Sequence, residues 1–319
     1  MTPFDDNSGF SGVPQSSDPL ALPTPPVSAA PAFAEVPPGD PFTYGAQYPQ
    51  PYKFAAPPPP DLQVPWSWGH LISFGVFGFF ALVFVQLIFM AYYIHAKALS
   101  ARPTQPEFQR LALSKPVFAV GSMVFWYALL FFFLYATLTF FYRTTFWQSL
   151  GWRKFNHENH KAPAKPWIYF SLGCALSIIV LILTAAAKTP EHAPIQDLLK
   201  NRNMAFAFMG MAVLVAPLVE ETIFRGYLFP LLARWFGIAS GIVVTGVLFG
   251  LMHGYQLGWA WAHVATLIGV GIIFTIVRSR AETTLASFLM HLGYNSTIAL
   301  LGTLGLFFAK YGKVPPHHP

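Results

Sequence analysis

Long apolar segments alternate with short polar ones from Trp66 onward, and this pattern restricts the chain to few folds. Roughly 20 apolar residues in a helix cross the hydrocarbon core of a bilayer. Within that core the backbone must satisfy its own hydrogen bonds, which favours helices. The pattern predicts spanning helices at 70–94, 117–142, 167–187, 204–236, 239–253, 259–277 and 283–309. We therefore predict an all-α, polytopic transmembrane bundle of about seven spans, with a range of roughly six to eight.

The composition agrees with a membrane protein, since 54% of the residues are hydrophobic and only 10% are charged. Lys and Arg lie mostly between apolar segments, which suits lipid headgroups, and no basic stripe with interleaved aromatic residues indicates nucleic acid. We expect a multi-pass protein of the plasma membrane or an endomembrane, with the bilayer as a partner and no nucleic-acid partner. Nine Lys and Arg would fall on each side of seven alternating spans, so no orientation follows.

Residues 1–66 form a different kind of segment, because 17 of the 29 prolines lie there. Pro-rich sequence without helical periodicity is typical of disorder with some polyproline II structure. We expect a disordered tail at 1–66, which either is a solvated spacer or docks a protein partner through Tyr44, Tyr48 and Tyr52. Three leading helices at 67–190, a catalytic helical core at 191–312 and a C-terminal tail at 313–319 complete the predicted organisation.

Two adjacent carboxylates, Glu220 and Glu221, lie inside the apolar segment 204–236. Ionisable residues at membrane depth are costly unless partnered, so they indicate a functional site. Arg225 follows Glu221 by one helical turn and is its expected ion-pair partner. Glu220 is rotated by about 100° around the helix and has no cation in its own turn. Glu220 is therefore the candidate general base.

Two further pairs with a spacing of four lie in later apolar segments, Phe249 with His253 and His291 with Asn295. Residues four apart share one face of a helix, so each pair can line one cavity. We expect His253 to share the proton that Glu220 removes from water, or to hold that water, and we expect Phe249 to form a wall of the cavity. His291 and the amide of Asn295 supply hydrogen-bond donors for an oxyanion.

The three motifs are EETIFR at 220–225, FGLMH at 249–253 and HLGYN at 291–295. In this order they resemble the EExxxR, FxxxH and HxxxN motifs of the CAAX protease and bacteriocin-processing family, also called CPBP or Abi proteins. The resemblance covers 206–304 and implies a glutamic-type intramembrane endopeptidase, similar to the Ras-converting CAAX endopeptidase. The implied substrates are membrane-associated proteins or peptides, with prenylated CAAX-type proteins as one class.

Carried over from the family motifs, the implied catalytic residues are Glu220, His253, His291 and Asn295. Glu220 and His253 would activate water, while His291 and Asn295 would stabilise the oxyanion. The resemblance assigns the other two motif residues, Glu221 and Arg225, a supporting role or the binding of a substrate carboxylate.

Several alternatives stay open at this stage. We favour chemistry without a cofactor, because an HExxH helix is absent, but Glu220, His253 and His291 offer ligands that zinc accepts. A catalytically idle protein that binds partners or gives immunity to a toxin is one alternative function. A proton-coupled transporter is another, although no inverted repeat is evident. His263 matches no motif, and interfacial packing is the preferred interpretation for it.

Overall fold

The structure is a computed structural model that describes residues 59–96, 100–185, 187, 194, 196, 199 and 201–311. Of the tail expected at 1–66, residues 1–58, with the three tyrosines, lie outside the described residues. The C-terminal tail expected at 313–319 also lies outside them. The described residues contain helices and no strand, as the sequence predicts. In chain order the elements are η1 (Pro60–Leu62), α1 (Trp68–His95), α2 (Gln105–Ser114), α3 (Pro116–Ala136), η2 (Thr137–Phe141), α4 (Phe146–Ser149), α5 (Pro166–Thr184), α7 (Arg202–Leu214), α8 (Ala216–Glu221), η3 (Thr222–Leu228), α9 (Phe229–Phe236), α10 (Ile238–Met252), α11 (Trp261–Ala281) and α12 (Thr284–Tyr311).

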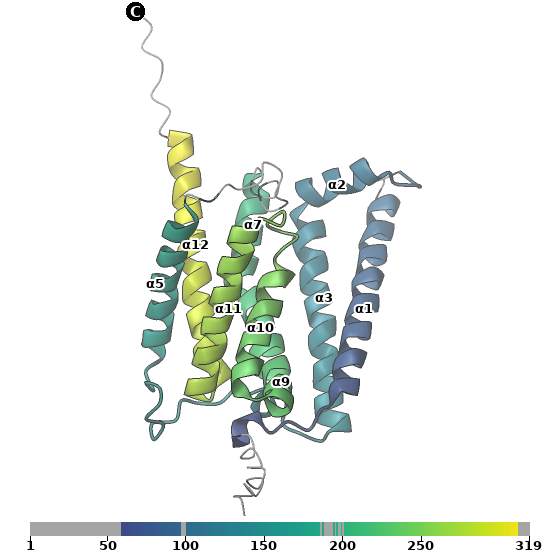
Figure 1. Cartoon of the computed structure of the whole chain (residues 1–319). Coiled ribbons are helices and arrows are strands. Elements are labelled where there is room, and N and C mark those ends of the chain that lie inside the picture. Colours follow the sequence, from purple (N-terminus) through teal and green to yellow (C-terminus); the bar gives the residue numbers. More distant parts are fainter. Residues whose placement is uncertain are drawn as a thin grey trace, which may run out of the picture. The chain divides into compact units, whose positions relative to one another are not determined.

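Among the described residues, five helical segments are long and apolar enough to cross a membrane, where the sequence pattern predicts about seven. They are Trp68–His95, Pro116–Phe141, Pro166–Thr184, Arg202–Phe236 and Trp261–Ala281. The two other expected spans are also helical. At 15 residues, α10 is short for a full crossing, whereas α12 has 28 residues and carries His291 and Asn295, which lower its hydropathy. The seven segments run roughly alongside one another (Figure 1).

The short helix α2 lies across the ends of α1 and α3 (Figure 1). Its start is fixed by a capping box in which Thr104 accepts from the Glu107 backbone N–H and the Glu107 carboxylate accepts from the Thr104 backbone N–H. This second hydrogen bond lowers the pKa of the exposed Glu107 carboxyl. At the ends of the two spans, Phe108 of α2 packs edge-on against Phe118 of α3.

Glycines let the helices around the centre of the bundle approach closely, as intramembrane packing favours. A Cβ on Gly246 or Gly250 of α10 would lie 2.6 Å from the backbone nitrogen of Ile272 or Ile268 of α11. Gly293 of α12 likewise meets the Phe170 carbonyl oxygen of α5. These contacts set the antiparallel register of α10 against α11 and the close packing of α12 along α5, which runs parallel to it.

The helix expected at 204–236 changes its geometry twice. Pro217 lacks an N–H, so α7 ends at Leu214 and α8 begins at Ala216. Residues 222–228 then form a π-helix, a widened turn that often occurs at functional sites. Gly226 within this turn packs so closely that a Cβ would lie 2.6 Å from the Leu150 carbonyl oxygen. The two glutamates therefore lie at the junction of an α-helix and a π-helix, and the π-helix packs closely against Leu150.

Residues 60–66, called the strap from here on, pack against the bundle although the sequence analysis places them in the tail. Asp61 Oδ2 accepts from Arg278 Nη1 at 2.8 Å, and the Arg278 side chain is fully buried. Arg234 donates to the carbonyl oxygens of Val64 and Trp66. The strap thus contacts both α9 and α11.

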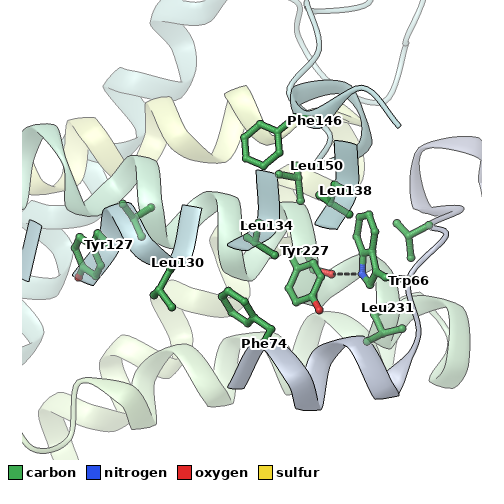
Figure 2. Packing of buried hydrophobic residues seen from close by; sticks show 12 residues of the cluster. Trp66, Phe74, Tyr127, Leu130, Leu134, Leu138, Phe146, Leu150, Tyr227 and Leu231 are labelled. Atoms are coloured by element: carbon green, nitrogen blue, oxygen red, sulfur yellow. Dashed lines mark hydrogen bonds between the residues drawn. The ribbon is translucent and has the colours of Figure 1, made fainter. Parts of the chain in front are cut away.

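The strap also contributes to a core cluster of buried residues. The Trp66 indole N–H donates to the Tyr227 carbonyl oxygen at 3.1 Å (Figure 2). The two rings stack with centroids 5.2 Å apart, and Phe74 and Leu134 pack beside them. In contrast, Phe79 and Phe132 are 63% and 65% exposed, which suits side chains that face lipid.

Candidate active site

Glu220 and Glu221 end helix α8, immediately before the π-helix. Glu221 is fully buried, whereas the side chain of Glu220 retains 11% exposure. Neighbouring residues differ by about 100° around a helix, so the two carboxylates face different surroundings. Glu220 lines a cavity, while Glu221 lies among protein groups.

The expected ion pair is confirmed, with Arg225 Nη1 at 2.8 Å from Glu221 Oε1. Arg225 is fully buried and also donates to the Gly271 carbonyl oxygen at 2.9 Å and to Thr275 Oγ1 at 3.3 Å. Its guanidinium carbon lies 4.5 Å from the ring centroid of Phe249. Because Arg225 does not line the cavity, the alternative that it binds a substrate carboxylate is not supported, and its contacts are those of a supporting residue.

Glu221 also holds His291, since the same Oε1 atom lies 2.9 Å from His291 Nδ1. A carboxylate only accepts hydrogen bonds, so His291 presents its protonated Nδ1 to Glu221. The other ring nitrogen, Nε2, lies 3.9 Å from Glu220 Oε2. Glu221 therefore links Arg225 to His291, and this contact places His291 Nε2 toward Glu220.

His253 reaches the same oxygen from another helix. Its Nδ1 lies 2.8 Å from the Phe249 carbonyl oxygen, which requires a proton on Nδ1. Its Nε2 lies 3.9 Å from Glu220 Oε2. That oxygen is buried and has no hydrogen-bond partner among the described residues. Two imidazole nitrogens thus converge on one unpartnered carboxylate oxygen.

The remaining predicted site residue, Asn295, lies one turn after His291 on α12. Its Nδ2 donates to the Ala212 carbonyl oxygen of α7 at 2.8 Å. The amide nitrogen carries two N–H groups, so one stays available for another acceptor. Neither this anchor nor the Gly271 carbonyl could be found from the motifs, since both are backbone groups of distant segments.

These side chains line a cavity of about 400 Å³ between α5, α7, α11, α12 and the end of α10. Glu220, His253, His291 and Asn295 all border it, and Phe249 forms part of its wall, as the sequence predicts. Most other lining residues are apolar, among them Met209, Leu267 and Val270. The described part of the chain contributes no Lys or Arg to this lining. The cavity is thus mostly apolar and has a compact polar centre.

Two features of the lining were not predicted. His263, for which the sequence analysis prefers interfacial packing, borders the cavity, and its Nδ1 is buried without a partner among the described residues. Glu220 also borders a second cavity of about 230 Å³, on the side of α1 and α3. Phe79 and Met252 line this second cavity and are more than half exposed. Glu220 therefore borders both cavities and lies between them.

The distances between the donor atoms bear on the zinc alternative. A tetrahedral zinc ion with ligands at its usual distances separates neighbouring ligand atoms by roughly 3.3 Å. Glu220 Oε2 is 3.9 Å from each Nε2 atom, and the described residues include no group of three or more His, Cys, Asp or Glu placed to hold a metal ion. The residues as they stand do not fit zinc, and chemistry without a cofactor stays a prediction.

Comparison with known proteins adds a family assignment to this geometry. Residues 202–297 match the family model described as type II CAAX prenyl endopeptidase Rce1-like. No curated protein and no solved structure matches the chain. The matched region contains all three motifs and every residue of the polar centre. The family is one of membrane-embedded proteases, which supports an integral membrane hydrolase of peptide bonds with membrane-associated substrates. The segment 202–297 of this membrane protein is therefore similar to the Rce1-like family within the CPBP proteins.

Proposed function

We propose that the protein is an intramembrane endopeptidase in which Glu220 removes a proton from the water that attacks the peptide bond. The observation that carries this proposal is the convergence of His253 Nε2 and His291 Nε2 on Glu220 Oε2, each at 3.9 Å. These separations exceed direct hydrogen-bond lengths. Two atoms 3.9 Å apart leave room for a water about 2.8 Å from both, so a water beside either imidazole nitrogen would satisfy the unpartnered carboxylate oxygen.

The reaction then follows from general-base chemistry. As the water oxygen bonds to the carbonyl carbon of the substrate, its proton moves to Glu220 and the carbonyl oxygen becomes an oxyanion. Glu220 next gives this proton to the leaving nitrogen as the C–N bond breaks. The products are a carboxylic acid and an amine, the acid then passes its proton to the amine to leave a carboxylate and an ammonium group, and Glu220 is again ionised.

The oxyanion needs hydrogen-bond donors beside the carbonyl that is attacked. Glu221 accepts a hydrogen bond from His291 Nδ1 and so holds the ring with Nε2 at 3.9 Å from Glu220 Oε2. His291 Nε2–H and the free N–H of Asn295 would then donate to the oxyanion. Glu221 and Arg225 act as positioning residues for His291.

The substrate class follows from the cavity and the family. An apolar lining of this kind suits an apolar segment of a membrane-associated protein or peptide. Prenylated CAAX-type proteins are the class that the family description names, and we propose them as the first class to test. A short peptide precursor without a lipid is the other class that the cavity accommodates.

The deciding experiment compares membranes that contain equal amounts of the wild type or of Glu220→Gln. Protein termini are identified by mass spectrometry, and proteins that accumulate uncut with Glu220→Gln become synthetic substrates. We expect turnover of these substrates to fall by about 10²-fold or more. Glu282→Gln is the matched control, since Glu282 lies outside both cavities and pairs with Lys161. Equal termini and equal turnover for the wild type and Glu220→Gln would exclude Glu220 as the base.

A further inference from the structure

Among the described residues that line the larger cavity, His263 is the one histidine that the polar centre does not use. It lies in the first turn of α11, and its buried Nδ1 has no partner in the described part of the chain. A buried ring nitrogen without a partner is costly, so such an atom points to an acceptor or donor that arrives with a ligand. Gln256, in the loop before α11, borders the same cavity.

The distance from His263 to the polar centre follows from the register of α10 and α11. Gly250 lies against Ile268 and Gly246 against Ile272, so Phe249 is level with residue 269. The His253 ring lies 4.8 Å from that of Phe249. His263 is six residues before position 269, which places it about 9 Å along the helix axis. An extended peptide covers this distance in about three residues.

The charges lining the cavity decide which chemical group His263 would meet. Glu220 is the only acidic residue in the described lining, so an ammonium group near His263 would find no anion there. The lining contains no Lys or Arg either, which leaves histidine as the available partner for an anion. A carboxylate placed next to Glu220 would be repelled, whereas at His263 it gains a charge-assisted hydrogen bond.

The second cavity gives the substrate a direction. It opens beside exposed side chains of α1 and α10, where a membrane-held part of a substrate can enter. With the scissile bond at Glu220, the released part then extends into the larger cavity toward His263. Resting on the proposed function, we propose that His263 is a specificity-determining residue that binds the C-terminal carboxylate of the substrate, assisted by the amide of Gln256.

The test measures binding and needs no turnover. The probes are the apolar tripeptide acetyl-Leu-Ile-Phe as the free acid and as the C-terminal amide, titrated calorimetrically into the full-length protein in lipid nanodiscs. We expect the wild type to bind the acid about tenfold or more tightly than the amide. His263→Phe should bring the ratio to about one, and His263→Asn, which keeps a polar atom near the position of Nδ1, should retain part of it.

His157→Phe is the matched control, because His157 is exposed in the loop before α5 and should leave the ratio unchanged. Equal binding of acid and amide by the wild type, no binding of either, or an acid preference that survives in folded His263→Phe would each overturn the inference. Failure of the proposed function is separate, since it would appear as unchanged turnover in Glu220→Gln.

Discussion

Removing Arg225 would leave Glu221 as a buried carboxylate without a cation, held by hydrogen bonds to His291 and Ser287. Breaking a buried ion pair from one side costs roughly 3–5 kcal/mol. The other two hydrogen bonds of Arg225 add little to the loss, because the Gly271 carbonyl oxygen keeps the Thr275 hydroxyl as a donor at 2.7 Å. We therefore expect Arg225→Ala to destabilise the folded protein by about 3–5 kcal/mol, almost entirely through the stranded charge.

Glu221→Ala should cost a similar amount, since it strands the guanidinium and also releases His291 Nδ1. The double variant removes both charges, so its loss should be smaller than the sum of the two single losses by at least about 2 kcal/mol. The assay is unfolding in mixed micelles with an increasing fraction of SDS, followed by circular dichroism. Glu220→Gln serves as the comparison and should unfold like the wild type. Strictly additive losses would show that the two side chains do not stabilise each other, and the choice of Glu220 as the base would lose its physical ground.

Three other predictions test the cofactor, the packing and the strap. Protein purified without added zinc and dialysed against a chelator should stay active and contain much less than one metal ion per chain by elemental analysis; a zinc ion whose removal and return control activity would contradict this. Gly293→Ala should separate α12 from α5 and cost roughly 1–3 kcal/mol, while Gly210→Ala, where a Cβ meets nothing within 4 Å, should be neutral or stabilising; the same unfolding assay compares them. Deletion of residues 1–58 should preserve folded yield, whereas Asp61→Ala in the full chain should lower it by stranding Arg278; an unaffected Asp61→Ala protein would remove the stabilising role of the strap.

The parts of the fold that depend on local spacing could be predicted from the sequence. The Glu221–Arg225 pair, the break at Pro217 and the helical character of the seven apolar segments all follow from residues within a turn or from segment length. The link between His291 and Glu221 joins residues 70 positions apart and depends on how α12 packs against α8. Sequence spacing carries no information on that contact.

The strap was missed for a related reason. Asp61 follows a run of prolines and resembles a solvated residue, and its partner Arg278 lies 217 positions later. The position of His263 at the cavity was hidden as well, because a lone histidine at the start of an apolar helix is typical of a membrane interface. In both cases the decisive observation is burial, which requires the tertiary structure.

The π-helix at 222–228 makes the length of this segment more important than its exact residues. A π-helical turn accommodates one residue more than an α-helical turn, and one residue corresponds to about 100° of rotation. Deleting one residue here would restore an α-helical turn with little rotation of α9, because the wide turn absorbs that residue. A second deletion has no such turn to absorb it and would rotate α9 by about 100° relative to the glutamates, so that Arg234 would lose its hydrogen bonds to the strap and Gly226 its close packing on Leu150. Related sequences should therefore tolerate the loss of one residue in this segment but not of two.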